Sequence, residues 1–183
     1  MGKRINKGVG YLSLGLILLL VAASWFVYNI CEDTNAGKKS QIILNQMENS
    51  EAEESVFNIG GEEFCGRIII DSLGIELPVY DNWNYDYLKT APCRYSGSVD
   101  TDDIIIAGHN YKSHFGRLDN LKIDDEVVFL DAQGITHTFV VKEIAQLDGT
   151  AVTDMKSGEW DFTLFTCNKS GMQRITLRCH RKE

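Results

Sequence analysis

Residues 162–179 read FTLFTCNKSGMQRITLRC. Apolar and polar residues alternate from Phe162 to Cys167 and again from Arg174 to Cys179, which is typical of two β-strands. The intervening residues 168–171, Asn-Lys-Ser-Gly, are turn formers. The stretch therefore predicts a β-hairpin in which Cys167 ends the first strand and Arg174 begins the second, so that the two residues lie side by side.

A cysteine in this position suits nucleophilic catalysis. The thiolate is the reactive form of cysteine, and a neighbouring positive charge such as that of Arg174 favours it. An arginine beside the thiol can also bind the oxyanion that forms when a carbonyl is attacked. Acyl transfer is therefore the first functional hypothesis. The alternative is that Cys167 is a buried structural thiol and Arg174 a solvated surface charge.

The sequence pattern of the rest of the chain after Phe64 is typical of an all-β domain. Turn signals such as Ser72-Leu73-Gly74 and Ala132-Gln133-Gly134 separate short runs of β-forming residues. The runs cover residues 66–70, 75–80, 104–107, 127–130, 136–144, 162–167 and 174–179. Some seven short strands predict a barrel or a sandwich, and a short helix is expected over residues 115–121.

A second candidate residue, His109, follows a strand that is apolar throughout. Residues 104–107, Ile-Ile-Ile-Ala, read as a strand buried on both faces, and Gly108 then permits a sharp exit. A histidine just past such a strand is held rigidly at the rim, which suits a general acid or base. The alternative is a structural histidine. The other histidines, His114, His137 and His180, lie in weaker contexts.

The N-terminal region predicts a membrane anchor. Residues 8–31 contain no charged residue and are predominantly apolar, and about twenty such residues in a helix span a bilayer. Lys3, Arg4 and Lys7 precede the run, and Glu32 and Asp33 follow it. The positive-inside rule therefore places the N-terminus in the cytoplasm and the body outside the membrane.

The expected domain organisation follows from this anchor. Residues 1–31 are a cytoplasmic tip and a transmembrane signal anchor, residues 32–60 a polar acidic tether with a short helix in part of it, and residues 61–183 a catalytic β-barrel. A signal peptide cleaved near Ala22-Ala23-Ser24 is the alternative. The apolar run continues beyond Ser24, longer than the 7 to 15 or so residues of an h-region, which favours an uncleaved anchor.

Charge and cysteine content exclude some classes of function. The chain of 183 residues has a formal net charge of −8, which argues against nucleic acid as a partner. The five cysteines (Cys31, Cys65, Cys93, Cys167 and Cys179) form no CxxC pair, and adjacent Cys179 and His180 are poorly placed to share one zinc ion. We therefore expect no metal site and, because the number is odd, no complete disulfide framework.

Taken together, these motifs resemble the sortase family of Gram-positive surface-protein transpeptidases. The resemblance covers residues 64–183, and its most specific part is the combination of T-L-x-T-C, an arginine after it, and an upstream A-G-H after a strand. The residues that carry it are Leu77-Pro78-Val79-Tyr80, Ala107-Gly108-His109-Asn110, Phe115 with Leu118 and Leu121, Thr163-Leu164-Phe165-Thr166-Cys167, and Arg174. The compact hairpin and the sequence Gly-His-Asn-Tyr at residues 108–111 favour the class B or class D branch.

The resemblance implies a fold, an activity and partners. The fold is a closed eight-stranded β-barrel, and the activity is cleavage of an LPxTG-like sorting signal between Thr and Gly. The acyl group then passes to an amine of a peptidoglycan precursor or to a pilin lysine, so the implied partners are surface proteins or pilins that carry the signal. The reaction needs no cofactor, and calcium activation is left open.

Each catalytic role is carried over residue by residue. The resemblance makes Cys167 the nucleophile, His109 the general acid and base, and Arg174 the oxyanion or substrate-positioning group. Two departures stand out: residues 168–173 are short for this loop, and Cys179 stands where relatives often have glycine. Two other functions stay open, a purely hydrolytic cysteine peptidase and a non-catalytic anchored β-domain.

Overall fold

A computed structural model describes residues 7–53, 55–156 and 158–182. The chain forms two compact units, Met1–Asn35 and Ala36–Glu183. The long helix α1 (Lys7–Glu48) contributes to both. Each unit is described by itself.

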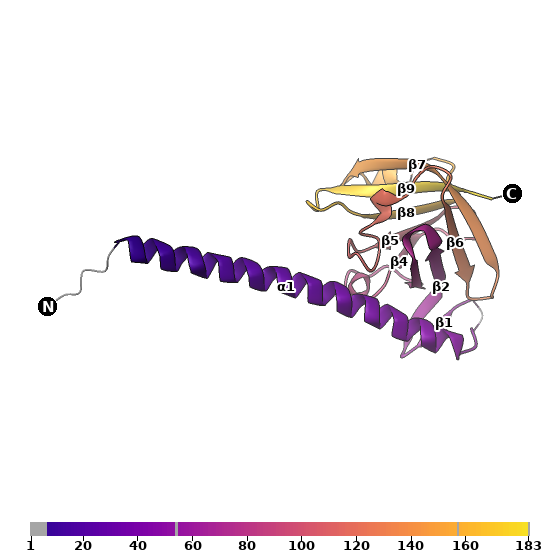
Figure 1. Ribbon diagram of the computed structural model, residues 1–183. Coiled ribbons are helices and arrows are strands. Elements are labelled where there is room, and N and C mark those ends of the chain that lie inside the picture. Colours follow the sequence, from indigo (N-terminus) through magenta and orange to yellow (C-terminus); the bar gives the residue numbers. More distant parts are fainter. Residues whose placement is uncertain (1–6, 54, 157, 183) are drawn as a thin grey trace. The chain divides into compact units, whose positions relative to one another are not determined.

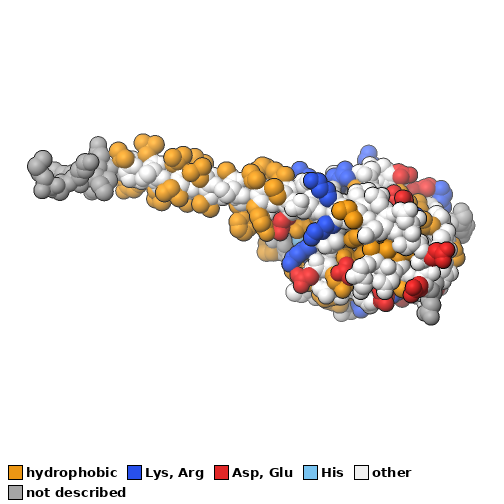
Figure 2. Space-filling model, turned by 90° about the horizontal axis from the view of Figure 1, so that it is seen from below, with side chains coloured by type: hydrophobic (Ala, Val, Ile, Leu, Met, Phe, Trp, Pro, Cys, Tyr) orange, Lys and Arg blue, Asp and Glu red, His pale blue; other side chains and the backbone are white. Residues whose placement is uncertain are grey.

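Of the first unit, the structure describes residues 7–35, which form the N-terminal part of α1 and are mostly apolar. Its large side chains from Val9 to Ile30 are exposed, and Figure 2 shows hydrophobic side chains along this part of the helix. Among the described residues, α1 is the one helix long and apolar enough to cross a membrane. The helix predicted over residues 8–31 is therefore present. Lys3 and Arg4, on which the expected orientation depends, lie outside the described residues.

The second unit contains the barrel. Strand β2 (Glu62–Ile70) is followed by β3 (Ile75–Tyr80), β4 (Cys93–Ser96), β5 (Ile104–Gly108), β6 (Glu126–Asp131), β7 (Thr136–Asp148), β8 (Phe162–Cys167) and β9 (Gln173–Arg181). Their order in the sheet is β2-β3-β4-β5-β8-β9-β7-β6, and pairing of β2 with β6 closes it (Figure 1). A short strand, β1 (Phe57–Ile59), pairs with β2 outside the barrel. The predicted closed eight-stranded barrel is confirmed.

Alternation along the strands explains the core. Most of the barrel strands contribute side chains that are almost completely buried, and these fill the barrel. They include Ile68, Val79, Ile106, Phe129, Phe139, Leu164 and Leu177. Two aromatic rings of this cluster, Phe139 and Phe162, stack with their centroids 4.4 Å apart. The barrel interior is therefore packed, and any substrate site has to lie on its outer surface or rim.

Some elements were not predicted. Strand β4 has four residues and makes a single parallel pairing with β3, Tyr80 with Cys93, before it pairs with β5. A short helix, α2 (Val152–Lys156), follows β7. Within residues 115–121, where a helix was expected, the structure has a single 3-10 turn, Leu118–Asn120; two other 3-10 turns are Asp71–Leu73 and Tyr87–Lys89.

The segment expected to be a tether with a short helix differs in its first half, where the helix is continuous with the N-terminal one and packs on the barrel. From Ala36 to Glu48 the chain is helical and belongs to the second unit. The reason is an apolar stripe of Ile43, Leu44 and Met47, at helical spacing, which is buried together with Phe64 and Tyr80 of the barrel. Burial of such side chains stabilises the helix on the barrel.

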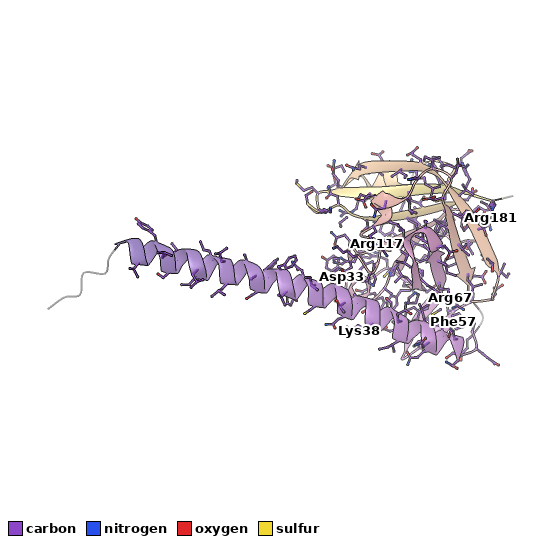
Figure 3. The ribbon with its side chains drawn as sticks, viewed as in Figure 1. Asp33, Lys38, Phe57, Arg67, Arg117 and Arg181 are labelled. Atoms are coloured by element: carbon purple, nitrogen blue, oxygen red, sulfur yellow. The ribbon has the colours of Figure 1, made fainter. Side chains whose placement is uncertain are left out.

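An ion pair reinforces the same contact at the end of the helix. The Arg67 guanidinium lies 3.5 Å from the Glu48 carboxylate and 2.9 Å from that of Glu76. Figure 3 shows Arg67 and Phe57 near this end of α1. Residues 36–48 are therefore part of the folded body.

Candidate active site

The β8–β9 hairpin places Cys167 opposite Arg174. The two residues are direct partners in the antiparallel register, whereas Arg178 pairs with Thr163 at the other end of β8. The predicted register is therefore confirmed. Because directly opposite residues project to the same face of a sheet, the Cys167 thiol and the Arg174 side chain share the outer face.

The turn of this hairpin is held by its own polar groups. The Asn168 backbone N–H donates to the Gln173 carbonyl at 2.9 Å, and the Asn168 carbonyl accepts from the Gly171 N–H at 3.0 Å. The Ser170 hydroxyl donates to the Asn168 side-chain oxygen at 2.8 Å. Gly171 has a φ of 77°, a conformation that favours glycine. These contacts set where β9 begins and hence where Arg174 lies.

The strand that precedes His109 runs beside the strand that ends in Cys167. β5 and β8 are parallel, and Gly108 is the partner of Thr166, so the next residues of the two strands are His109 and Cys167. The Asn110 side chain donates to the Asn168 carbonyl at 3.4 Å, which ties together the two loops that leave these strands. The structure thus brings the three predicted residues to one rim of the barrel.

Gly108 is required for the turn into His109. A Cβ atom at this position would lie 2.3 Å from the Phe115 ring, and Phe115 is completely buried. The Phe115 N–H in turn donates to the His109 carbonyl at 3.2 Å. The glycine therefore lets the loop fold back tightly enough for His109 to sit at the strand end.

A groove runs beside Cys167 on the outer face of the barrel. Its volume is about 510 Å³, and Cys167 and Arg174 both line it. Most of the other lining side chains are apolar or aromatic, among them Trp83, Tyr85, Leu88, Tyr95, Val152, Met155 and Phe165. Size and apolar lining suit an extended peptide segment.

Aromatic contacts shape one wall of this groove. The Tyr95 ring makes edge-to-face contacts with Trp83 at 6.1 Å and with Phe165 at 5.4 Å between centroids. Phe165 lies two residues before Cys167 on the same strand face, so this wall leads toward the thiol. Sequence reasoning missed these residues, although the aromatic-rich sequence Trp-Asn-Tyr at residues 83–85 was visible in the turn after β3.

Within the described part of the chain, hydrogen bonds use only one of the guanidinium nitrogens of Arg174. One guanidinium nitrogen, Nη1, donates to the Gly171 carbonyl at 3.2 Å and to the Gln173 carbonyl at 3.4 Å. A guanidinium has five N–H donors in a planar fork, so others can reach a ligand in the groove. Hydrogen bonds from Thr150, and to a smaller extent the charge of Arg174, hold the pKa of the groove residue Asp148 below its usual value.

The other barrel cysteines are structural. Cys65, Cys93 and Cys179 are buried, and burial raises the pKa of each thiol to about 12. They are therefore protonated and unreactive at neutral pH. Cys179 packs in the barrel core between its partners Val141 and Phe162, which accounts for an apolar residue at this position.

The remaining histidines and Arg178 have other contacts. Arg178 is 9 % exposed and donates to the Asp154 carbonyl of α2 at 2.6 Å. His137 lies 2.7 Å from the Asp131 carboxylate, His180 stacks on Trp160, and His114 is buried against Ser40 of α1. Of the four histidines, His109 is the one that directly follows a strand paired with β8.

Comparison with known proteins adds an independent observation. A family model described as the sortase domain matches residues 68–182. No curated protein sequence matches the chain.

Solved structures of sortases share the fold. Sortase C1 from Streptococcus agalactiae is 27% identical, with a TM-score of 0.56, 64% of this chain and 67% of that chain covered. Sortase C from Clostridium perfringens SM101 is 22% identical, with a TM-score of 0.58 and coverage of 83% and 90%. Sortase A from Corynebacterium diphtheriae is 17% identical, with a TM-score of 0.59 and coverage of 82% and 84%. For the two structures that are 22% and 17% identical, the likeness concerns the fold alone.

Proposed function

The chain belongs to the sortase family, because the family's domain model matches residues 68–182, and on this premise we propose that it is a cysteine transpeptidase acting on LPxTG-like sorting signals. It cleaves the signal between Thr and Gly and transfers the acyl group to an amine. The observation that carries the proposal is the strand register. It sets Cys167 opposite Arg174 and beside the end of β5, which His109 directly follows. Cys167 and Arg174 also line a groove of a size that suits a peptide.

In the first half of the reaction, the Cys167 thiolate attacks the threonine carbonyl carbon. A C–S bond forms, the carbonyl oxygen takes up the electron pair, and the resulting oxyanion lies where the Arg174 guanidinium can donate to it. The intermediate then collapses and the Thr–Gly C–N bond breaks. Protonated His109 delivers its proton to the departing glycine amine, which leaves neutral.

In the second half, an acceptor amine attacks the thioester. Neutral His109 takes the proton that the amine loses, a new C–N bond forms, and the C–S bond breaks to return the thiolate. A covalent intermediate is needed because one amine must leave before the other arrives. Each step uses side chains of this chain and the two amines, with no cofactor.

The groove and the anchor suit such a substrate. Trp83, Tyr95 and Phe165 offer an apolar wall for the extended sorting motif, and a thioester shielded from water favours transfer over hydrolysis. The apolar part of α1 would hold the enzyme at the membrane with its barrel outside the cell, where surface proteins or pilins and peptidoglycan precursors meet. These proteins and amines are the proposed partners.

The test incubates the full chain in detergent with a panel of LPxTG-like peptides, with and without amine acceptors, and reads the products by mass spectrometry. We expect cleavage between Thr and Gly, a product joined to the amine, and an acyl adduct on Cys167. Products that are hydrolysed to the same extent with or without amine would instead indicate a peptidase. No cleavage of any peptide by a folded chain would contradict the proposal.

A further inference from the structure

An aromatic side chain stacks on the proposed acid–base residue. The rings of His109 and Tyr111 lie nearly parallel, 15° apart, with their centroids separated by 3.9 Å. Both residues are half-buried. A cation within about 6 Å of the face of a tyrosine ring is attracted by the ring's quadrupole, so this geometry favours the imidazolium over the neutral imidazole.

Backbone hydrogen bonds keep the loop that carries both rings in one shape. The Tyr111 carbonyl accepts from the His114 N–H at 3.0 Å and from the Gly116 N–H at 2.8 Å, while the His109 carbonyl accepts from the Phe115 N–H. A Cβ at Gly116 would lie 2.3 Å from the Asn110 carbonyl oxygen, so the loop closes tightly on itself. The distance between the two rings is therefore set by the loop.

The opposite side of the loop is supported from α1. The His114 ring is tilted by 58° against Tyr111, with 5.6 Å between centroids, and it is completely buried. Its Nε2 lies 3.3 Å from the Ser40 hydroxyl oxygen, and that hydroxyl donates to the Thr90 carbonyl at 2.7 Å. Because the single hydroxyl proton goes to Thr90, Nε2–H of His114 is the donor to Ser40. Tyr111 thus packs against a ring that is itself fixed in place.

We propose that Tyr111 is a positioning residue for His109, which holds the imidazole at the rim and stabilises its protonated form. The inference rests on the proposed role of His109 as the acid that protonates the leaving amine. Without the stack, the imidazole could rotate away from the scissile bond, and fewer molecules would carry the proton at neutral pH.

Other charged groups around His109 stay constant in the test. The titratable and charged side chains on its own loop are Tyr111, Lys112, His114 and Arg117, and those at the adjoining ends of β8 and β9 are Cys167 and Arg174. Positive Lys112 and Arg174 oppose the imidazolium, and a Cys167 thiolate favours it. Because Tyr111→Leu and Tyr111→Phe both leave these groups in place, the difference between the two variants reports the contribution of the aromatic ring at position 111.

The first measurement needs no activity. In the full chain in detergent, the imidazole proton signals are followed by NMR as a function of pH, and the His109 signal is identified by its loss in His109→Gln. Tyr111→Leu should move the His109 titration midpoint to lower pH by about half a unit, and Tyr111→Phe should leave it unchanged. An unchanged midpoint in a folded Tyr111→Leu variant would overturn the proposal, and so would an equal shift in Tyr111→Phe.

The chain offers a matched control in a second histidine–aromatic stack. Trp160, in the loop before β8, stacks on His180 of β9 with 4.9 Å between the ring centroids, and both residues are distant in sequence from His109. Trp160→Leu removes the same kind of contact and should leave the His109 midpoint where it is. A shift of the His109 midpoint in this control equal to that in Tyr111→Leu would show a general effect and overturn the assignment.

Kinetics with a cleaved peptide then separate positioning from folding. Tyr111→Leu should lower kcat by about tenfold and leave KM little changed. This loss is smaller than the roughly 10² to 10⁴ in rate that removal of the whole acid–base group costs. Tyr111→Phe should keep kcat near that of the wild type. A wild-type chain that cleaves no peptide while the midpoint still shifts would refute the proposed function and leave the stack's effect on His109 established. A wild-type chain that cleaves peptides, with kcat equal in all Tyr111 variants, would overturn the positioning role.

Discussion

Replacement of Arg174 by alanine removes the guanidinium that lies opposite the proposed nucleophile. Because Arg174 is the direct strand partner of Cys167, no other described arginine on β9 is as close to the developing oxyanion. Loss of one oxyanion donor typically costs about 10² to 10³ in kcat, so we expect Arg174→Ala to lose at least about 10² in kcat/KM. Arg174→Lys should recover only part of this, since lysine lacks the planar fork.

Arg178 is the matched control on the same strand and the same face. It pairs with Thr163, four residues further along, or about 13 Å at roughly 3.3 Å per residue, which is beyond the reach of a guanidinium from Cys167. Its hydrogen bond to the Asp154 carbonyl fixes α2 instead. A hydrogen bond of a charged group contributes about 1.5 to 3 kcal/mol, and a domain of this size loses about 2 to 4 °C in Tm per kcal/mol, so Arg178→Ala should lower Tm by about 3 to 12 °C with a smaller loss of activity.

The assay is steady-state cleavage of one good peptide substrate by both variants, at a temperature well below each Tm measured by circular dichroism. We expect the kinetic loss at Arg174 and the stability loss at Arg178. A larger loss of kcat/KM in folded Arg178→Ala than in Arg174→Ala would refute the reasoning from the hairpin register.

Three further predictions concern the remaining site residues. Cys167→Ala should abolish cleavage and transfer while Tm stays near that of the wild type, because its thiolate is the proposed covalent catalyst; turnover near wild type would contradict this. His109→Ala should cost about 10² to 10⁴ in rate and one limb of the pH–rate profile, whereas His114→Ala should mainly lower Tm; the reverse result would exchange their roles. Gly108→Ala forces a Cβ into the Phe115 ring and should destabilise the domain by about 1 to 3 kcal/mol, as measured by chemical denaturation.

Interactions between near neighbours in the sequence were predicted well. The hairpin register follows from two alternating runs joined by a short turn, so the proximity of Arg174 to Cys167 could be derived without the fold. Most strands of the barrel and the apolar N-terminal helix likewise follow from periodicity and composition. Strand β4 was not predicted because it has only four residues and no clear alternation of apolar and polar residues.

Contacts between distant parts of the chain came only from the tertiary structure. The sequence marks His109 as a rim histidine by its local context, but its place beside Cys167 depends on the parallel pairing of β5 with β8. Parallel strands need a long crossover, and no local signal specifies which strands will pair across it. For the same reason, the burial of Cys179 and the contact of Ser40 with His114 were not visible in the sequence. Local propensity and turn chemistry thus determine the elements and the hairpin, whereas the closure of the barrel, which buries the apolar faces of all its strands at once, decides which functional side chains meet.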